Sequence, residues 1–314
     1  PRNRFTRMVG LSWKALRLSL RERADIYHIH DPELLPVAMA LKLLLRAKVI
    51  YDVHEDLPRQ ILTKSWIPSW LRGIVAKGAT VMEAVGAVLL DGIVAATPGI
   101  ATRFPREKTV VVQNFPLLSE FAVSEPLPYD NRPPYVVYIG GLTAIRGAFE
   151  MVKAMEHLPP DLPATLVLAG EFSPPTLMDE VSGLPGWARV RFLGWQSRER
   201  VASLLGRARV GLVLLHPTPN YVDGWPTKLF EYMAAGVPVV ASDFPLWRQI
   251  VGEARCGLLV DPLDPRAIAE AILWLLKHPQ EAKAMGERGR QAVLDRYNWE
   301  VEGRKLVQFY RRLS

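Results

Sequence analysis

The stretch Asp223–Ser242, DGWPTKLFEYMAAGVPVVAS, contains the signals of one helix followed by one buried strand. Pro226 favours a helix start, because proline is tolerated in the first turn of a helix. Gly236 is suited to end that helix, which we expect over Lys228–Ala235. The apolar run Val237–Ala241 is typical of a strand covered on both faces. A helix that leads directly into such a strand predicts an α/β fold with a parallel sheet.

The same alternation of strands and helices extends from this stretch in both directions. Further strands are expected at Ala24–His30, Lys48–His54, Gly92–Ala96, Thr109–Gln113, Tyr135–Ile139, Ala164–Ala169, Val190–Leu193, Val210–Leu215 and Gly257–Val260. The clearest helical patterns cover Pro68–Leu90, Pro265–Lys277, Gln280–Asp295 and Glu300–Arg312. The chain of 314 residues is long enough for two domains. We therefore predict two doubly wound, Rossmann-like domains in tandem.

The predicted boundary between the domains is the segment 124–134, SEPLPYDNRPP, which has four prolines and no periodic apolar pattern. It separates an N-terminal domain, residues 1–123, from a C-terminal domain, residues 135–297. The final helix, residues 298–314, is expected to pack back on the N-terminal domain.

Composition excludes several classes of protein. Cys256 is the only cysteine, so an intrachain disulfide and a cysteine-ligated zinc site are ruled out, and a reducing cytoplasm is favoured. No apolar run reaches the length of about 20 residues that a membrane-spanning helix needs. The sequence also lacks a zinc-protease motif, a hydrolase nucleophile elbow, a metal-binding Asp-x-Asp triplet and a nucleic-acid-binding module. We expect neither a metal site nor a nucleic-acid partner.

Positive charge is concentrated in the first quarter of the chain. Residues 1–80 contain 14 Lys and Arg against 7 Asp and Glu, which accounts for the whole net charge of +7. Such an imbalance favours an anionic partner. The opening segment also has apolar residues at helical spacing, namely Phe5, Val9, Trp13, Leu16 and Leu20. It is either an amphipathic helix on an anionic membrane surface or a helix packed on the sheet with a solvated basic face. Trp66 and Trp70 fit a membrane interface or an acceptor cleft.

The segment Tyr138–Gly147, YIGGLTAIRG, joins a strand to a helix. Gly140 and Gly141 allow a phosphate to approach the backbone, and the following helix N-terminus attracts anions. Arg146 adds a positive charge and several hydrogen-bond donors. The alternative is a tight turn with a solvated arginine.

In the stretch Asp223–Ser242, Thr227 and Lys228 lie at the predicted helix N-terminus, where binding of an anion is favoured. Glu231 follows Lys228 by three residues and so lies on the same side of the helix. Its carboxylate can accept two sugar hydroxyls. The alternative is an ordinary carboxylate that interacts with the helix dipole.

Together with VLAGEF (167–172), VRFLGW (190–195) and CGLLVDPLD (256–264), these motifs resemble the large family of retaining GT-B glycosyltransferases that use nucleotide sugars. The resemblance covers essentially residues 24–314 and is strongest over 135–297. It implies a GT-B fold, in which two domains face a cleft. It also implies transfer of a sugar from a nucleoside-diphosphate sugar to a hydroxyl, with no metal and no further cofactor.

The resemblance also implies roles for individual residues. Gly140, Leu142 and Gly147 match the loop that holds the donor pyrophosphate. In that loop Arg146 replaces the usual lysine and Gly141 replaces the usual arginine, so Lys228 is expected to supply the second cation.

The donor sugar and nucleoside have their own expected contacts. Glu231 matches the glutamate that binds the nucleotide ribose, and Asp223 stands where the family contacts the donor sugar. Glu171 and Thr227 are further donor-site candidates, and Trp195 either packs or stacks on the base.

In the N-terminal domain, YDVHED resembles the loop whose histidine faces the transferred sugar. His54 matches that histidine, and Glu55 and Asp56 are expected to meet acceptor hydroxyls. His30 is given no chemical role. The family's first strand-and-helix unit, with its glycine-rich loop, has no match, so we expect the sequence to be a fragment.

We therefore expect a retaining, metal-independent glycosyltransferase with a UDP- or GDP-sugar donor and a lipid-linked or polysaccharide acceptor of the cell envelope. It would be cytoplasmic, on the inner face of the membrane. One alternative is a non-catalytic nucleotide-sugar-binding subunit at the membrane surface. The other is a GT-B nucleotide-sugar 2-epimerase that uses Asp56 and Glu171 as acid and base.

Overall fold

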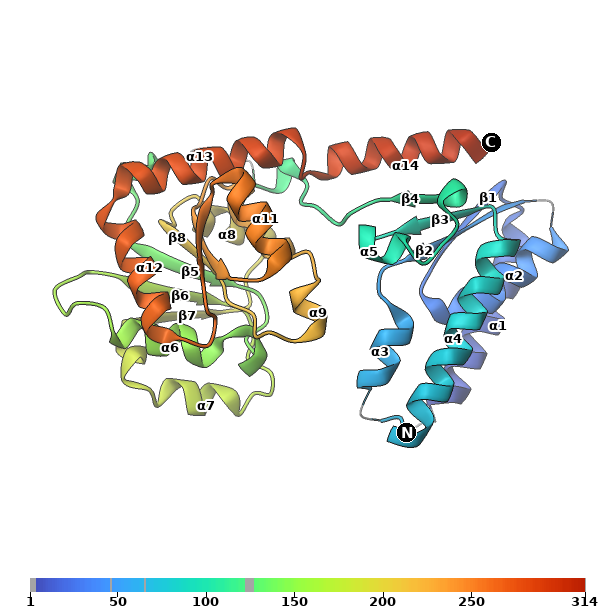
Figure 1. Ribbon diagram of the computed structural model, residues 1–314, viewed down its shortest axis with the longest axis horizontal. Helices are drawn as coiled ribbons and strands as arrows, with labels where there is room; N and C mark the ends of the chain where they lie inside the picture. The colour runs from blue at the N-terminus through green and yellow to red at the C-terminus, as the bar shows by residue number, and fades with distance from the viewer. Residues whose placement is uncertain (1–3, 46, 65, 122–126, 314) are drawn as a thin grey trace. The chain divides into compact units, whose positions relative to one another are not determined.

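The computed structural model of the protein describes residues 4–45, 47–64, 66–121 and 127–313. The chain forms two compact units (Figure 1). The first consists of Pro1–Asn114 and Val301–Ser314, and the second is Phe115–Glu300. Both are parallel α/β units, as predicted.

The first unit contains a parallel sheet of four strands in the order β1-β2-β3-β4. The strands are β1 (Ile26–His30), β2 (Lys48–Val53), β3 (Gly92–Ala95) and β4 (Thr109–Val111). Its helices are α1 (Arg4–Glu22), α2 (Leu35–Leu44), α3 (Leu57–Thr63), α4 (Ser69–Leu89) and α5 (Pro98–Ala101), with short 3-10 helices at Pro32–Leu34 and Arg106–Lys108. The largest fully buried side chains come from β2, β3 and the helices that cover them, among them Leu35, Leu41, Ile50 and Ile93.

The final helix, α14 (Trp299–Leu313), contributes its later turns to the first unit. Phe309 is buried against the start of β3, where a Cβ on Gly92 would lie 2.5 Å from the phenylalanine ring. Glu302 is also buried and accepts a hydrogen bond from the backbone N–H of Gln113 at 2.9 Å. The fit between glycine and phenylalanine fixes this helix on the sheet of the first unit.

The second unit contains a parallel sheet of six strands in the order β10-β9-β8-β5-β6-β7. The strands are β5 (Tyr135–Ile139), β6 (Thr165–Ala169), β7 (Val190–Gly194), β8 (Val210–Val213), β9 (Val239–Ser242) and β10 (Gly257–Val260). The α-helices are α6 (Ala148–Glu156), α7 (Leu177–Ser182), α8 (Arg198–Leu205), α9 (Pro219–Val222), α10 (Thr227–Ala234), α11 (Pro245–Ala254), α12 (Pro265–Lys277) and α13 (Pro279–Asp295). Short 3-10 helices lie at Leu118–Phe121, Tyr129–Asn131, Ala144–Arg146 and Pro185–Arg189.

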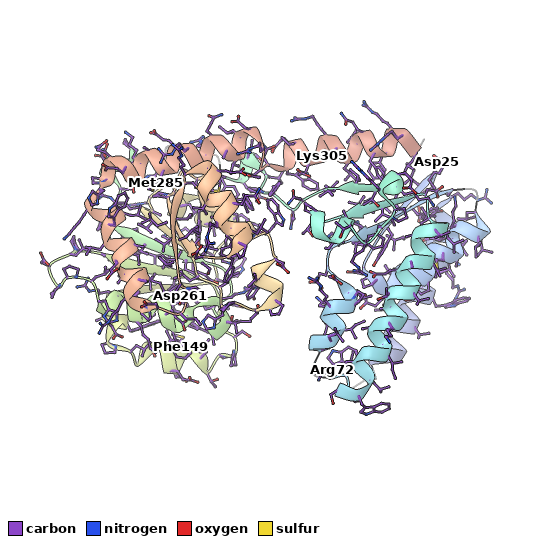
Figure 2. All side chains as sticks on the ribbon, viewed as in Figure 1. Asp25, Arg72, Phe149, Asp261, Met285 and Lys305 are labelled. Atoms are coloured by element: carbon purple, nitrogen blue, oxygen red, sulfur yellow. The ribbon has the colours of Figure 1, made fainter. Side chains whose placement is uncertain are left out.

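This order places β5 and β8 side by side at the point where the winding reverses. Ligands of doubly wound sheets bind beyond the carboxyl ends of the strands at that switch point. The topology therefore identifies the ends of β5 and β8 as the place to look for a site. Side chains fill the layers on both faces of the sheet (Figure 2).

The unit boundary differs from the predicted linker over 124–134. Described residues of that segment pack on the second unit: the Tyr129 hydroxyl donates to the Arg209 carbonyl at 2.9 Å, and Arg132 Nη1 donates to the Ala208 carbonyl at 3.0 Å. Both side chains are buried. The prolines limit regular secondary structure in the described part of this segment to the short 3-10 helix Tyr129–Asn131, but they do not prevent packing.

The strands lie within two residues of their predicted ends. The short helices α3 and α9 were not predicted, because each has seven residues or fewer and no long apolar period. In the described ranges, no helix is long and apolar enough to cross a bilayer.

Candidate functional site

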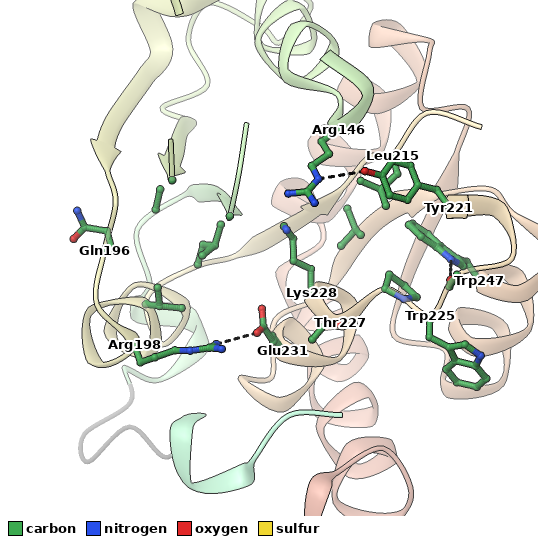
Figure 3. A pocket seen from close by; sticks show the side chains of 18 of the residues that line it. Arg146, Gln196, Arg198, Leu215, Tyr221, Trp225, Thr227, Lys228, Glu231 and Trp247 are labelled. Carbon is green, nitrogen blue, oxygen red and sulfur yellow. Dashed lines mark hydrogen bonds and ion pairs between the residues drawn. The ribbon is translucent and has the colours of Figure 1, made fainter. Parts of the chain in front are cut away.

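A pocket of about 550 Å³ lies in the second unit beyond the carboxyl ends of β5, β6 and β8 (Figure 3). Its walls include Ile139 at the end of β5, Gly140 directly after it, Leu215 after β8, and the first residues of α10. The buried Ser242 hydroxyl accepts from the backbone N–H of Leu215 at 2.9 Å, which holds the segment after β8 on the neighbouring strand β9. The pocket therefore occupies the topological switch point.

Two glycines shape the loop between β5 and α6. Gly140 has φ +122°, and a Cβ on it would lie 2.5 Å from Lys228 Nζ. Gly147 has φ +74°, and a Cβ there would lie 2.5 Å from the carbonyl oxygen of Leu214. Both backbone conformations favour glycine, and at Gly147 the backbone carbonyl of Leu214 also leaves no space for a side chain. The loop can then pass close to Lys228 and pack against the end of β8.

Arg146 and Lys228 place two cations in the same part of the pocket (Figure 3). Arg146 Nε lies 3.4 Å from the Tyr221 hydroxyl, and this hydrogen bond raises the pKa of the guanidinium. Lys228 Nζ lies 5.1 Å from the centre of the Tyr138 ring. Burial, and then the charge of Arg146, lower the pKa of Lys228 to about 8. Two cations held together in a partly desolvated site favour the binding of an anion.

Glu231 lies further along α10. Among the described residues that line this pocket, it is the one that has a carboxylate. Its Oε1 accepts from Arg198 Nη1 at 3.1 Å (Figure 3). The Glu231 side chain is 15% exposed, whereas that of Arg198, on α8, is 67% exposed. The carboxylate is thus oriented from one side, and it lies in the same pocket as both cations.

Trp195 and Gln196 follow β7 and line another wall of the pocket. Gln196 Nε2 donates to the carbonyls of Leu193 and Trp195, at 2.7 and 2.8 Å, which holds this turn in place. The indole of Trp195 is 71% exposed. An exposed ring at the edge of a pocket is available for a flat ligand group.

Not every residue that the sequence marked for the donor site lines this pocket. Arg146, Gly140, Trp195, Thr227, Lys228 and Glu231 line it, while Gly141, Glu171 and Asp223 are not among its described lining residues. Glu171 and Asp223 have exposed side chains. Glu171 contributes its backbone carbonyl, which accepts from the N–H of Leu142 at 2.9 Å.

Other residues of the pocket were not predicted. Tyr221 and Trp225 lie in the segment after β8, and Trp247, on α11, donates to the Gly224 carbonyl at 2.9 Å. Tyr221 and Trp225 both fall in the segment 217–231, where position after a strand predicts site residues, but neither was given an individual role. Arg198 gives no such signal, since its pairing with Glu231 depends on how α8 and α10 pack.

In the first unit, His54 lies in a cluster at the carboxyl ends of β1 and β2. His54 Nε2 is 3.1 Å from His30 Nδ1 and 3.5 Å from Asp52 Oδ1. His28 joins the same cluster through its Nε2, which is 3.1 Å from Asp52 Oδ2. Burial lowers the pKa of His30. No role was predicted for His28, His30 or Asp52, although His-x-His and Asp-x-His on neighbouring strands put all four side chains on one face.

The two acceptor candidates have structural contacts of their own. Asp56 is the N-cap of α3, accepting from the N–H of Arg59 at 3.3 Å, and it pairs with Arg103 Nη1 at 3.0 Å. Glu55 is exposed and accepts a hydrogen bond from Gln60. Asp56 therefore stabilises the start of a helix, and Glu55 is the more accessible of the pair.

Comparison with known protein families and sequences agrees with this architecture. Residues 119–292, more than half of the chain, match the family described as glycosyl transferases group 1, and residues 1–114 match a glycosyl transferase 4-like domain. The chain is 26% identical over 261 residues to alpha-maltose-1-phosphate synthase of Mycolicibacterium smegmatis, covering 79% of this chain and 67% of that protein. It is 31% identical over 185 residues to D-inositol 3-phosphate glycosyltransferase of Corynebacterium urealyticum, covering 56% of this chain and 42% of that protein.

Solved structures share the fold. Sucrose-phosphate synthase from Thermosynechococcus elongatus aligns with a TM-score of 0.75 at 22% identity, over 100% of this chain and 80% of that one. Anabaena HepE in complex with UDP aligns with a TM-score of 0.77 at 15% identity, over 96% and 82%. The chain belongs to the glycosyl transferases group 1 family and is a glycosyltransferase with the GT-B fold.

Proposed function

We propose that this glycosyltransferase takes its sugar from a nucleoside-diphosphate sugar bound in the pocket of the second unit. The observation that carries the proposal is the pair of cations, Arg146 and Lys228, which are half-buried in one pocket at the switch point. A pyrophosphate supplies the negative charge that such a pair requires. The N-terminus of α10, which has eight residues, adds backbone N–H groups to the same anion site.

The other walls offer groups that suit the rest of the donor. Glu231 accepts hydrogen bonds from the ribose hydroxyls, and the Trp195 face is available to the base. A solved structural neighbour, Anabaena HepE, is described in complex with UDP and with UDP-glucose. That neighbour supports a uridine nucleotide as the first donor to test.

We propose that transfer retains the anomeric configuration and that the pyrophosphate needs no divalent ion. Arg146 and Lys228 stabilise the charge that develops on the leaving diphosphate, which is the role a metal ion has in other transferases. Glu231, the carboxylate among the described lining residues, is assigned to the ribose. This supports attack from the leaving-group face, with a donor phosphate oxygen taking the acceptor proton, over attack by an enzyme carboxylate.

A donor-hydrolysis panel tests the transfer proposal. Slow release of nucleoside diphosphate from one UDP- or GDP-sugar is expected, with the released sugar keeping its configuration by NMR. Arg146→Ala should lower this turnover by about a hundredfold, the scale of one preorganised donor. The exposed Arg200→Ala is the matched control and should leave it unchanged. Equal turnover in Arg146→Ala and parent would remove the phosphate role.

We further propose that the first unit meets an anionic lipid surface, where a lipid-linked acceptor is available. The supporting observation is an exposed apolar face on α4, at Trp70, Ile74, Val81, Val85 and Val88. On α1, Leu16 and Leu20 pack against the core of this unit, as expected of a helix on a sheet, while Val9 and Trp13 are 52% and 61% exposed. The side chain of Phe5 lies outside those described.

Vesicle co-sedimentation tests this second proposal. The protein should sediment with anionic vesicles at low salt and be released at high salt, because exposed charges are screened. A Trp70→Ser/Ile74→Ser variant should sediment much less, whereas Val307→Ser, on an exposed site of α14, should behave like the parent. Identical sedimentation of Trp70→Ser/Ile74→Ser and parent would contradict the membrane role of this face.

A further inference from the structure

Three chelating side chains converge at the carboxyl end of the sheet in the first unit. His28 and His30 are two residues apart on β1, so their side chains point to the same face of the sheet. Asp52 on β2 lies opposite His30 in the strand register. One ligand atom from each of the three lies within 4.8 Å of the others. His28 Nε2 and His30 Nδ1 are 3.1 and 3.3 Å from the same oxygen, Asp52 Oδ2.

The two nitrogen–oxygen separations, 3.1 and 3.3 Å, are close to the edge length of a tetrahedral coordination shell. Zinc binds imidazole nitrogen and carboxylate oxygen at about 2.0–2.2 Å, so two ligand atoms of a tetrahedron lie about 3.3 Å apart. The imidazoles of His28 and His30 are stacked, with centroids 4.6 Å apart and 7° between their planes. Because an imidazole coordinates a metal in the plane of its ring, binding of one ion by both histidines requires the exposed His30 ring to turn out of this stack.

The surroundings of His28 resemble those of a metal ligand. Its other ring nitrogen, Nδ1, is hydrogen-bonded to the hydroxyl of Tyr310 on α14. A ligating histidine usually uses its second nitrogen in this way, which fixes the ring orientation. The three side chains also differ in exposure. Those of His28 and Asp52 are 14% and 10% exposed, whereas that of His30 is 56% exposed. An ion can therefore reach the cluster from the His30 side and be enclosed by the other two ligands.

We propose that His28, His30 and Asp52 bind one divalent transition-metal ion of the zinc type. Two imidazoles and one carboxylate suit zinc, whereas calcium and magnesium prefer ligand sets made of oxygen. Three protein ligands leave a fourth position open to water or to a substrate oxygen. His54, which touches His30, borders that position. The site is separate from the donor pocket, whose residues all belong to the second unit.

Metal titration of the full chain tests this proposal. Zinc is titrated in competition with a chromophoric chelator, and cobalt is used as a spectroscopic probe. One equivalent of zinc should bind with submicromolar affinity, and one equivalent of cobalt should give the intense visible absorption of a tetrahedral site. His30→Ala, at an exposed position, and His28→Ala should each weaken zinc binding by about a hundredfold or more. Tyr310→Phe, which removes a partner of a ligand, should weaken it by about tenfold.

The matched control is His157→Ala/His278→Ala, which removes two histidines outside the cluster and should leave zinc affinity unchanged. The titration of the parent protein is by itself a test. The proposal is overturned if no zinc binds, or if bound cobalt gives the weak visible absorption of an octahedral ion. Equal zinc affinity in His30→Ala and parent also overturns it. UDP binding should be the same in all these variants, so failure of the metal proposal is distinguishable from failure of the donor proposal.

Discussion

At the residue scale, Lys228 links the electrostatics of the pocket to its proposed ligand. Burial, and then the charge of Arg146, lower its pKa from 10.5 to about 8. Because the pKa is lower in the folded chain than in the unfolded one, the buried charge reduces stability below about pH 8. This loss of folding stability becomes smaller as the pH rises from about 8 towards 10.5, because the amine loses its charge. A bound pyrophosphate acts in the opposite direction, since it favours the protonated amine.

Binding of nucleoside diphosphate should therefore take up most of a proton at about pH 8.5 and much less at about pH 7.5, both above the range, about pH 6, in which the diphosphate itself ionises. Calorimetry of UDP in two buffers of different ionisation enthalpy measures this uptake. The apparent enthalpies should differ between buffers at the higher pH for the parent but not for Lys228→Met. Identical enthalpies in both buffers at about pH 8.5 would contradict the placement of the diphosphate at Lys228.

A separate prediction concerns Glu231, whose proposed partners are the ribose hydroxyls. UDP should bind the parent more tightly than 2′-deoxy-UDP does, by roughly tenfold, the scale of a hydrogen bond to a charged group. Glu231→Ala should remove that preference. The control is Glu253→Ala, which breaks an exposed ion pair with Arg296 of 3.4 Å and should preserve it. A preference that survives in Glu231→Ala rules out the ribose assignment.

The donor-pocket residues were predictable to different degrees. Arg146, Lys228 and Glu231 were identified because helix N-termini and glycine-rich turns have local sequence signals. Arg198 was missed because it meets Glu231 only through the packing of α8 and α10. His28 and Asp52 were missed for a similar reason, as their meeting depends on the register of β1 and β2.

At the scale of elements, the β5–α6 connection depends on Gly147. Alanine at φ +74° is strained by about 1–2 kcal/mol, and its Cβ would also meet the Leu214 carbonyl. We expect Gly147→Ala to lower the free energy of unfolding by at least that amount and to reduce turnover by displacing Arg146. Gly252→Ala, in α11 with open space around it, should be neutral or stabilising. Chemical denaturation measures both, and equal stability of Gly147→Ala and parent would contradict the strain argument.

A second element-scale prediction concerns the charged network that joins β2, α3 and α4. Arg103 pairs with the buried Glu83 and with Asp56, and the Tyr51 hydroxyl lies 3.4 Å from Glu83. Arg103→Met leaves a buried carboxylate unpaired and should lower the free energy of unfolding by about 3 kcal/mol. The exposed Arg106→Met should change it by less than about 0.5 kcal/mol.

Adding Glu83→Leu to Arg103→Met should restore much of the lost stability, since the unpaired charge is then removed. Denaturation curves for the two single variants and the double variant provide the test. If Arg103→Met were as stable as the parent, the network would not stabilise this unit.

At the scale of the whole molecule, the order of strands and helices could be predicted because each parallel strand is a short apolar run bounded by breakers. The two α/β units and the switch point follow from that order. The position of the boundary between the two units was predicted less accurately. Tyr129 and Arg132 make a proline-rich segment part of the second unit through contacts with Arg209 and Ala208, which are distant in sequence.

The proposed function requires the pocket at the β5–β8 switch point to bind the nucleoside-diphosphate part of a sugar donor without a divalent ion. Calorimetric titration of UDP and GDP in excess EDTA tests it most directly. We predict that one of the two binds with a stoichiometry of one per chain, and that Lys228→Met weakens that binding by at least about tenfold. If neither nucleotide binds in EDTA, or if Lys228→Met binds as tightly as the parent, the account of this site is wrong.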